Sequence, residues 1–220
     1  MNVLSGFTGE PDRERSLASY RQLAFAYEAT TRRIVAIREA AVAALALRPG
    51  ETVLDVGCGA GATLPMLAAA CCPGGRVVGL EQSPEMARIA AERVRSQPHI
   101  EVVNAPAEEL PDGFAADALF FCYTHDILQS RSALARLRAN AKPGCRVVVA
   151  GLRFLPWTWG FAPNLFNGFR ARRYLTTFRG LREPWALIAE ACSEFKVVRH
   201  FHMGTSYLAV GRLAHPGPQR

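Results

Sequence analysis

The sequence predicts an α/β fold with a seven-stranded, mostly parallel sheet, an antiparallel last strand and helices on both faces. Two observations carry this prediction. Between residues 48 and 152, short apolar segments alternate with helical ones, an order that produces parallel strands covered on both sides. Near the C-terminus, two strand-like segments follow each other with only a short turn between them, which is typical of an antiparallel pair at the edge of a sheet.

The individual elements follow from periodicity and from the residues that begin and end them. Ser83 can cap a helix that has Pro84 in its first turn, and Arg48-Pro49-Gly50 ends a helical region before the first strand. The expected strands cover residues 52–56, 76–80, 100–103, 118–122, 145–150, 195–202 and 206–212. The expected helices after the first strand cover residues 62–70, 83–96, 130–139 and 184–192.

A chain of 220 residues suits a single domain with four parts. We expect a helical cap over 13–47, a ligand-binding core over 48–152, an insert of poor periodicity over 153–183, and a C-terminal helix with a strand pair over 184–212. No apolar run reaches the roughly 18 residues that span a bilayer. The six cysteines form no C-x-x-C and the N-terminus has no leader pattern, so we expect a cytoplasmic protein without bound metal.

A glycine-rich loop follows the first expected strand and opens a helix. In Asp55-Val56-Gly57-Cys58-Gly59-Ala60-Gly61, the glycines stand at alternate positions and let the chain turn sharply against a ligand. Dinucleotide sites usually space their glycines as G-x-G-x-x-G instead. A carboxylate at Asp55 would repel a diphosphate and would suit a ligand that carries an ammonium and a sulfonium group. The loop therefore favours S-adenosylmethionine (SAM) over a dinucleotide.

Glu81 supports the same interpretation. It ends the second expected strand, 20 residues past Gly61, where an acidic side chain can accept hydrogen bonds from both hydroxyls of a ribose. A solvated loop glutamate is the alternative, and the register with the glycine loop disfavours it.

The segment from Val53 to Gly61 resembles motif I of the class I SAM-dependent methyltransferases, a family with a Rossmann-like fold. The order of the later elements is similar over about residues 48–152 and again near 184–212. The chain looks most like the small-molecule branch that includes ubiquinone and menaquinone C-methyltransferases and bacterial phospholipid N-methyltransferases. The resemblance implies SAM as the cofactor and methyl transfer to a hydrophobic small molecule or lipid by in-line displacement.

The resemblance also implies roles for further positions. Asn104-Ala105 follows the third strand, where the family often has an aspartate beside the adenine. Tyr27 resembles an N-terminal tyrosine that covers SAM, with a core aromatic as the alternative. The implied cofactor-binding residues are Tyr27, Asp55, Gly57, Cys58, Gly59, Gly61, Glu81, Gln82, Met86, Asn104, Ala105, Cys122 and Tyr123.

His125 is the candidate for proton transfer. It follows the fourth strand, at the end where the family places the reacting methyl, and an unperturbed histidine titrates near neutrality. A base is needed only if the acceptor must lose a proton. Asp126 could assist this base or cap the following turn, and a structural histidine is the alternative for His125.

The insert carries most of the positive charge of the chain. The formal net charge is +7, and residues 152–183 contain six arginines, many aromatic residues and one acid, Glu183. This composition suits contact with an anionic membrane surface, or a cap over a hydrophobic, acidic small molecule. A nucleic-acid surface and a packed lid with solvated arginines are the alternatives.

Because the chain has no separate nucleic-acid-binding domain, we expect a lipid or small-molecule acceptor and no nucleic acid. An RNA methyltransferase and a non-catalytic SAM-binding regulator are the alternative functions. No pattern in the sequence indicates the oligomeric state.

Overall fold

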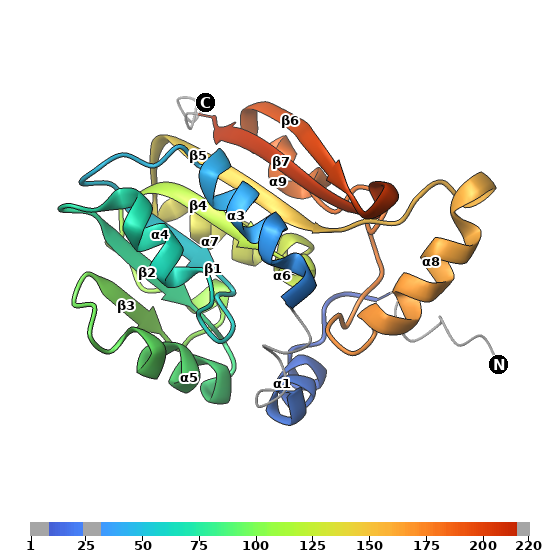
Figure 1. The fold of residues 1–220 in the computed structure, drawn as a ribbon, viewed down its shortest axis with the longest axis horizontal. Coiled ribbons are helices and arrows are strands. Elements are labelled where there is room, and N and C mark those ends of the chain that lie inside the picture. The colour runs from blue at the N-terminus through green and yellow to red at the C-terminus, as the bar shows by residue number, and fades with distance from the viewer. Residues whose placement is uncertain (1–8, 24–31, 215–220) are drawn as a thin grey trace.

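The computed structural model describes residues 9–23 and 32–214, which contain one seven-stranded sheet (Figure 1). Its strands lie in the order β3-β2-β1-β4-β5-β7-β6. They are β1 Thr52–Val56, β2 Arg76–Leu80, β3 Ile100–Val103, β4 Ala116–Cys122, β5 Ala141–Leu152, β6 Cys192–Phe201 and β7 Ser206–Leu213. The first five strands pair in parallel, and β7 lies antiparallel between β5 and β6. The predicted mostly parallel sheet with an antiparallel last strand is confirmed.

Helices cover both faces of the sheet, as predicted (Figure 1). One face carries α3 Val35–Ala44, α4 Leu64–Cys71 and α5 Pro84–Val94; the other carries α6 His125–Leu128, α7 Arg131–Ala139 and α9 Ala186–Glu190. The described residues also form three short 3-10 helices: η2 Arg32–Ile34, η3 Ala107–Glu109 and η4 His202–Gly204. The neighbouring residues Val53 and Leu54 are both fully buried, one in each core. The central strands β1, β2 and β4 are mostly apolar because side chains on both of their faces are covered, whereas the edge strand β6 is polar and largely exposed.

The N-terminal helical region has two parts with different surroundings. α1 (Arg13–Leu23) lies near the carboxyl ends of the parallel strands, whereas α3 packs on the sheet through Ile37 and Ala41 (Figure 1). Tyr27 lies outside the described residues. Of these two helices, α1 is the one placed to cover a ligand at the end of the sheet.

The insert contains a helix that its poor periodicity does not predict. This helix, α8, spans Trp157–Ala171 and includes Pro163. It buries the small residues Gly160 and Gly168, while its large apolar residues remain exposed. A helix is normally recognised from large apolar residues on its buried face, so α8 gives no such signal.

The strand that precedes the insert is longer than the predicted 145–150. β5 begins at Ala141 and ends at Leu152, and it pairs with β7 from Arg146 to Leu152.

None of the helices in the described part of the chain is both long and apolar enough to cross a bilayer.

Candidate functional site

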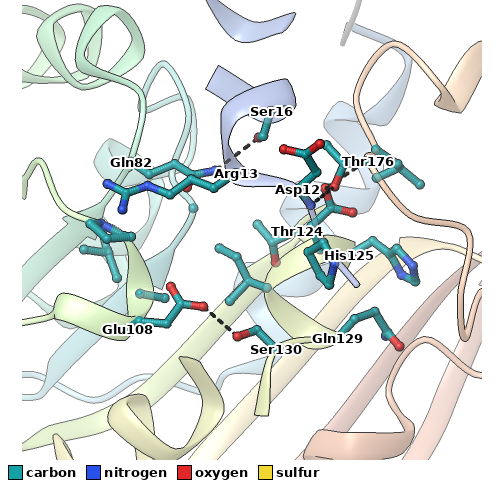
Figure 2. Close-up of a pocket in the computed structure, with 18 of the residues that line it drawn as sticks. Asp12, Arg13, Ser16, Gln82, Glu108, Thr124, His125, Gln129, Ser130 and Thr176 are labelled. Carbon is teal, nitrogen blue, oxygen red and sulfur yellow. Dashed lines mark hydrogen bonds between the residues drawn. The ribbon is translucent and has the colours of Figure 1, made fainter. Parts of the chain in front are cut away.

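A cavity of about 700 Å³ lies at the carboxyl ends of the central strands (Figure 2). Its walls include the glycine loop after β1, Glu81 and Gln82 after β2, residues 105–109 after β3, and residues 122–127 at the end of β4 and just beyond it. The opposite side comes from α1 and from residues 174–176 of the insert. In an open α/β sheet, ligands bind at this edge of the strands.

Each glycine of the loop adopts a backbone conformation that favours glycine. Gly57, Gly59 and Gly61 have φ angles of 72°, 57° and 75°, which other residues rarely adopt. The N–H groups of Gly57 and Cys58 donate to the Leu80 carbonyl at 2.8 and 3.0 Å, which joins the loop to the end of β2. The loop thus presents bare backbone to the cavity.

Glu81 is held by backbone amides of the neighbouring loops. Gly59 N–H donates to Oε2 at 2.9 Å, and Ser83 N–H donates to Oε1 at 2.8 Å. The residue is 7% exposed, and burial raises its pKa. The Gln82 backbone adds a further hydrogen bond to this carboxylate. A carboxylate has about four lone-pair sites, so Glu81 can still accept from the hydroxyls of a ligand. This arrangement fits the two hydroxyls of a ribose.

Asp55 does not line the cavity. Its side chain is 1% exposed, and Oδ2 accepts a hydrogen bond from Thr63 Oγ1 at 2.5 Å. Burial raises the pKa of Asp55 to about 7, and the hydrogen bond from Thr63 opposes this shift. Asp55 therefore fixes the start of α4, and its predicted contact with the ligand ammonium stays a prediction.

The residues predicted around the adenine are only partly brought together. Gln82 lines the cavity, and its Nε2 donates to Ser16 Oγ of α1 at 3.1 Å (Figure 2). Met86 is fully buried behind the wall. Asn104 donates from Nδ2 to the main-chain oxygen of Glu81 at 2.8 Å, so it joins β3 to β2.

Among the predicted site residues, those that line the cavity are Gly57, Gly59, Glu81, Gln82, Ala105, Cys122, Tyr123, His125 and Asp126. Those that the structure describes but does not place in the lining are Asp55, Cys58, Gly61, Met86 and Asn104.

Tyr123 leaves β4 in an uncommon backbone conformation. Its φ is 61°, and its N–H donates to the Ala150 carbonyl at 2.8 Å. The phenol donates to Ser206 Oγ at 3.2 Å, and burial raises the pKa of Tyr123 to about 12. Contacts with β5 and β7 therefore hold a protonated tyrosine at the cavity wall.

His125 connects the start of α6 to the insert. Its Nε2 lies 2.9 Å from the Arg179 carbonyl, so Nε2 carries the proton and donates. Nδ1 is then an acceptor, and it is buried without a hydrogen-bond partner in the described chain. Burial lowers the pKa of His125 to about 4, so the ring is neutral at pH 7.

Asp126 makes a second connection to the insert. Its Oδ2 accepts from Thr176 N–H at 2.9 Å and from Thr176 Oγ1 at 2.6 Å, and burial raises its pKa. Thr176 Oγ1 in turn accepts from the Asp12 N–H at 3.0 Å (Figure 2). Asp126 thus positions the chain on both sides of the cavity mouth.

Four functional candidates escaped the sequence analysis: Ser16, Arg38, Thr63 and Thr176. Arg38 of α3 interacts electrostatically with both Asp55 and Cys122. Nothing in the sequence separates it from the other arginines, because its role depends on how α3 packs against the ends of β1 and β4.

Comparisons with known proteins agree with this geometry. Residues 53–145 match the family model described as a methyltransferase domain. The demethylmenaquinone methyltransferase of Lysinibacillus sphaericus (strain C3-41) is 35% identical over 190 residues, which cover 76% of this chain and 80% of that protein. A 37.1 kDa protein in transposon TN4556 of Streptomyces fradiae is 39% identical over 108 residues, which cover 48% of this chain. The match spans 31% of that longer protein.

The fold is shared with solved methyltransferase structures. The N-methyltransferase NodS of Bradyrhizobium japonicum WM9, in complex with S-adenosyl-L-homocysteine, superposes with a TM-score of 0.66. The match covers 91% of this chain and 99% of that chain, at 18% sequence identity. The glycine loop, the anchored Glu81 and these similarities together show that the chain belongs to the class I SAM-dependent methyltransferases, whose cofactor is S-adenosylmethionine.

Proposed function

We propose that the protein is an enzyme that transfers a methyl group from SAM to a hydrophobic small molecule or lipid. The observation that carries this proposal is that one cavity joins two different walls. The glycine loop and Glu81 form one wall, and the insert contributes Tyr174 and Leu175 to the other. A cofactor on the first wall and an apolar acceptor on the second would meet beside Thr124 and His125, at the end of β4.

The donor side of the cavity fits SAM, which supplies a methyl group on a positively charged sulfur. The Glu81 carboxylate can accept hydrogen bonds from the ribose, and the bare backbone at Gly57 and Gly59 allows close approach. The cavity is lined by six acidic residues, Glu10, Asp12, Glu81, Glu108, Glu109 and Asp126, and by three arginines, Arg13, Arg131 and Arg179. This excess of carboxylates favours a cationic ligand.

The acceptor side must align the nucleophile with the methyl group for in-line displacement and exclude water. His125 is our candidate base, since it lines the cavity and is neutral at pH 7. A pKa of about 4 makes the ring a weak base, so this role suits an acceptor that ionises readily. Asp126 assists by positioning Thr176 and the segment around it.

A cytoplasmic location belongs to the same proposal. All six cysteines are free thiols, which is typical of a reducing compartment.

Incubation with methyl-labelled SAM and a host extract tests this function. We expect the label in the fraction that is soluble in organic solvent, and we expect Glu81→Gln to abolish the labelling. Glu101→Gln removes a carboxylate from the surface of β3 and serves as the control that keeps full labelling. Label in the RNA or protein fraction would contradict the substrate class. Tight SAM binding without turnover on any fraction would contradict the enzymatic function.

A further inference from the structure

α8 turns its large apolar residues away from the protein. Trp159, Phe161, Leu165, Phe166 and Phe169 are between 58% and 63% exposed, and we call them the aromatic face of α8. Figure 1 shows the helix standing apart from the sheet. Helices of soluble domains normally bury such a face, and a continuous exposed apolar surface marks an interaction site.

Contacts on the opposite side fix the rotation of α8. A Cβ at Gly160 would lie 2.4 Å from the Cβ of Leu155, so only glycine fits there. Asn164 is 1% exposed; its Oδ1 accepts from Leu155 N–H at 2.8 Å, and its Nδ2 donates to the Leu155 carbonyl at 2.9 Å. Gly168 and Ala171 continue this buried side. The aromatic face therefore points outward because the small residues hold the other side in place.

Arginine side chains border the aromatic face. Arg170 lies over the ring of Phe166 and Arg172 over the ring of Phe169, at 5.4 and 3.9 Å from the ring centroids. Arg173 is exposed beside them, and residues 151–182 contain no acid. A second copy of the chain would oppose these arginines with its own. An anionic bilayer complements their charge and accepts aromatic side chains at the level of its headgroups.

We propose that α8 docks the protein on an anionic lipid bilayer, with its aromatic face in the interfacial region. This inference rests on the proposed function and adds a partner to the same site. The chain runs from the end of α8 directly to Tyr174 and Leu175, which line the cavity. A hydrophobic acceptor that leaves the bilayer beside α8 therefore reaches the cavity wall within a few residues of the helix.

Co-sedimentation of the full chain with vesicles tests the proposal. The probe is a vesicle of phosphatidylglycerol and phosphatidylcholine in equal parts, compared with phosphatidylcholine alone. We expect binding to the anionic vesicles that weakens as salt is raised. Absence of binding to the anionic vesicles at low salt would overturn the inference.

Two double variants separate the apolar and the charged contributions. Phe166→Ser with Phe169→Ser removes exposed rings and should weaken vesicle binding by at least about tenfold. Arg172→Gln with Arg173→Gln should weaken it by about 25-fold, since each arginine near an anionic surface contributes about fivefold. Undiminished binding by either variant would show that α8 is not the docking element.

The control variants change the same chemistry elsewhere. Arg95→Gln with Arg138→Gln removes two exposed charges, one just after α5 and one on α7, and Val198→Ser removes an apolar side chain that is 45% exposed on β6. Both should bind vesicles as the parent protein does. A dimer that light scattering detects and that dissociates in the Phe166→Ser, Phe169→Ser variant would assign the aromatic face to self-association instead.

Calorimetry with SAM separates this inference from the proposed function. The α8 variants should bind SAM as the parent protein does, because neither pair of side chains lines the cavity. Vesicle binding without methyl transfer would retain the docking inference and remove the enzymatic function. Methyl transfer to a lipid-soluble acceptor without vesicle binding would retain the enzymatic function and remove the docking inference.

Discussion

Replacement of Gly57 by alanine measures how closely the glycine loop approaches the end of β4. The φ of Gly57 is +72°, and a Cβ built on it would lie 2.6 Å from Cγ2 of Thr124 and 3.2 Å from Cδ1 of Ile127. The left-handed conformation costs a residue with a side chain about 1–2 kcal/mol. Overpacking by one methyl group costs about 1–3 kcal/mol. We expect Gly57→Ala to lower the free energy of unfolding by about 3 kcal/mol and to weaken SAM binding.

Two further variants separate the backbone cost from the steric cost. Gly50 has a φ of +85°, and a Cβ added there would meet nothing within 4 Å, so Gly50→Ala should cost only about 1 kcal/mol. Thr124→Ser deletes the Cγ2 atom that a side chain at position 57 would strike. In that background, Gly57→Ala should cost distinctly less than it does beside threonine.

Urea unfolding of the ligand-free variants gives these free energies, and calorimetry gives the SAM affinities. If Gly57→Ala and Gly50→Ala destabilise the protein equally, the contact between the loop and β4 does not constrain the chain. If Thr124→Ser leaves the cost of Gly57→Ala unchanged, Thr124 is not the obstacle.

Three other substitutions test the site. Glu81→Gln should raise the SAM dissociation constant about 100-fold in calorimetry, because hydrogen bonds to a charged acceptor contribute about 1.5–3 kcal/mol each, whereas Glu101→Gln should leave it unchanged. Asp126→Asn should lower the free energy of unfolding by about 2 kcal/mol. Adding Thr176→Val to this variant should lower it little further, since both substitutions break the same hydrogen-bond network. When the pH falls from 6.5 to 4, the parent protein should lose about 3 kcal/mol of stability through His125, because the unfolded histidine binds its proton at a higher pH than the folded one, whose pKa is about 4. His125→Gln should not show this loss. Equal pH slopes for the parent and the variant would contradict the buried, neutral state of His125.

The fold could be predicted because its signals are local and repeated. The central strands of the parallel part contain short apolar runs, since side chains such as Val53 and Leu54 are buried on opposite faces. α8 could not be predicted, because the rule that large apolar residues face the core does not hold in this helix. Its buried side consists of residues such as Gly160 and Asn164, which carry no hydrophobic signal.

The residues of the candidate site also divide into those that the sequence predicts and those that it does not. The glycine loop and Glu81 could be predicted, because a fixed spacing along the chain places them at the ends of adjacent strands. Arg38 and Thr176 could not, because their roles arise when distant segments pack against β1 and α6. Asn104 reaches the expected place, but its amide group joins two strands.

The segment before α1 and the segment after α8 are tied to each other at the cavity mouth. Asp12 N–H donates to Thr176 Oγ1 at 3.0 Å, and Thr177 Oγ1 donates to the Gly9 carbonyl at 2.7 Å, although these partners are 164 and 168 positions apart in sequence. Neither segment can swing outward alone without breaking these bonds. A displacement that keeps these bonds therefore moves both segments together, and the two share a single opening equilibrium. Amide hydrogens in both should gain protection together when a ligand fills the cavity.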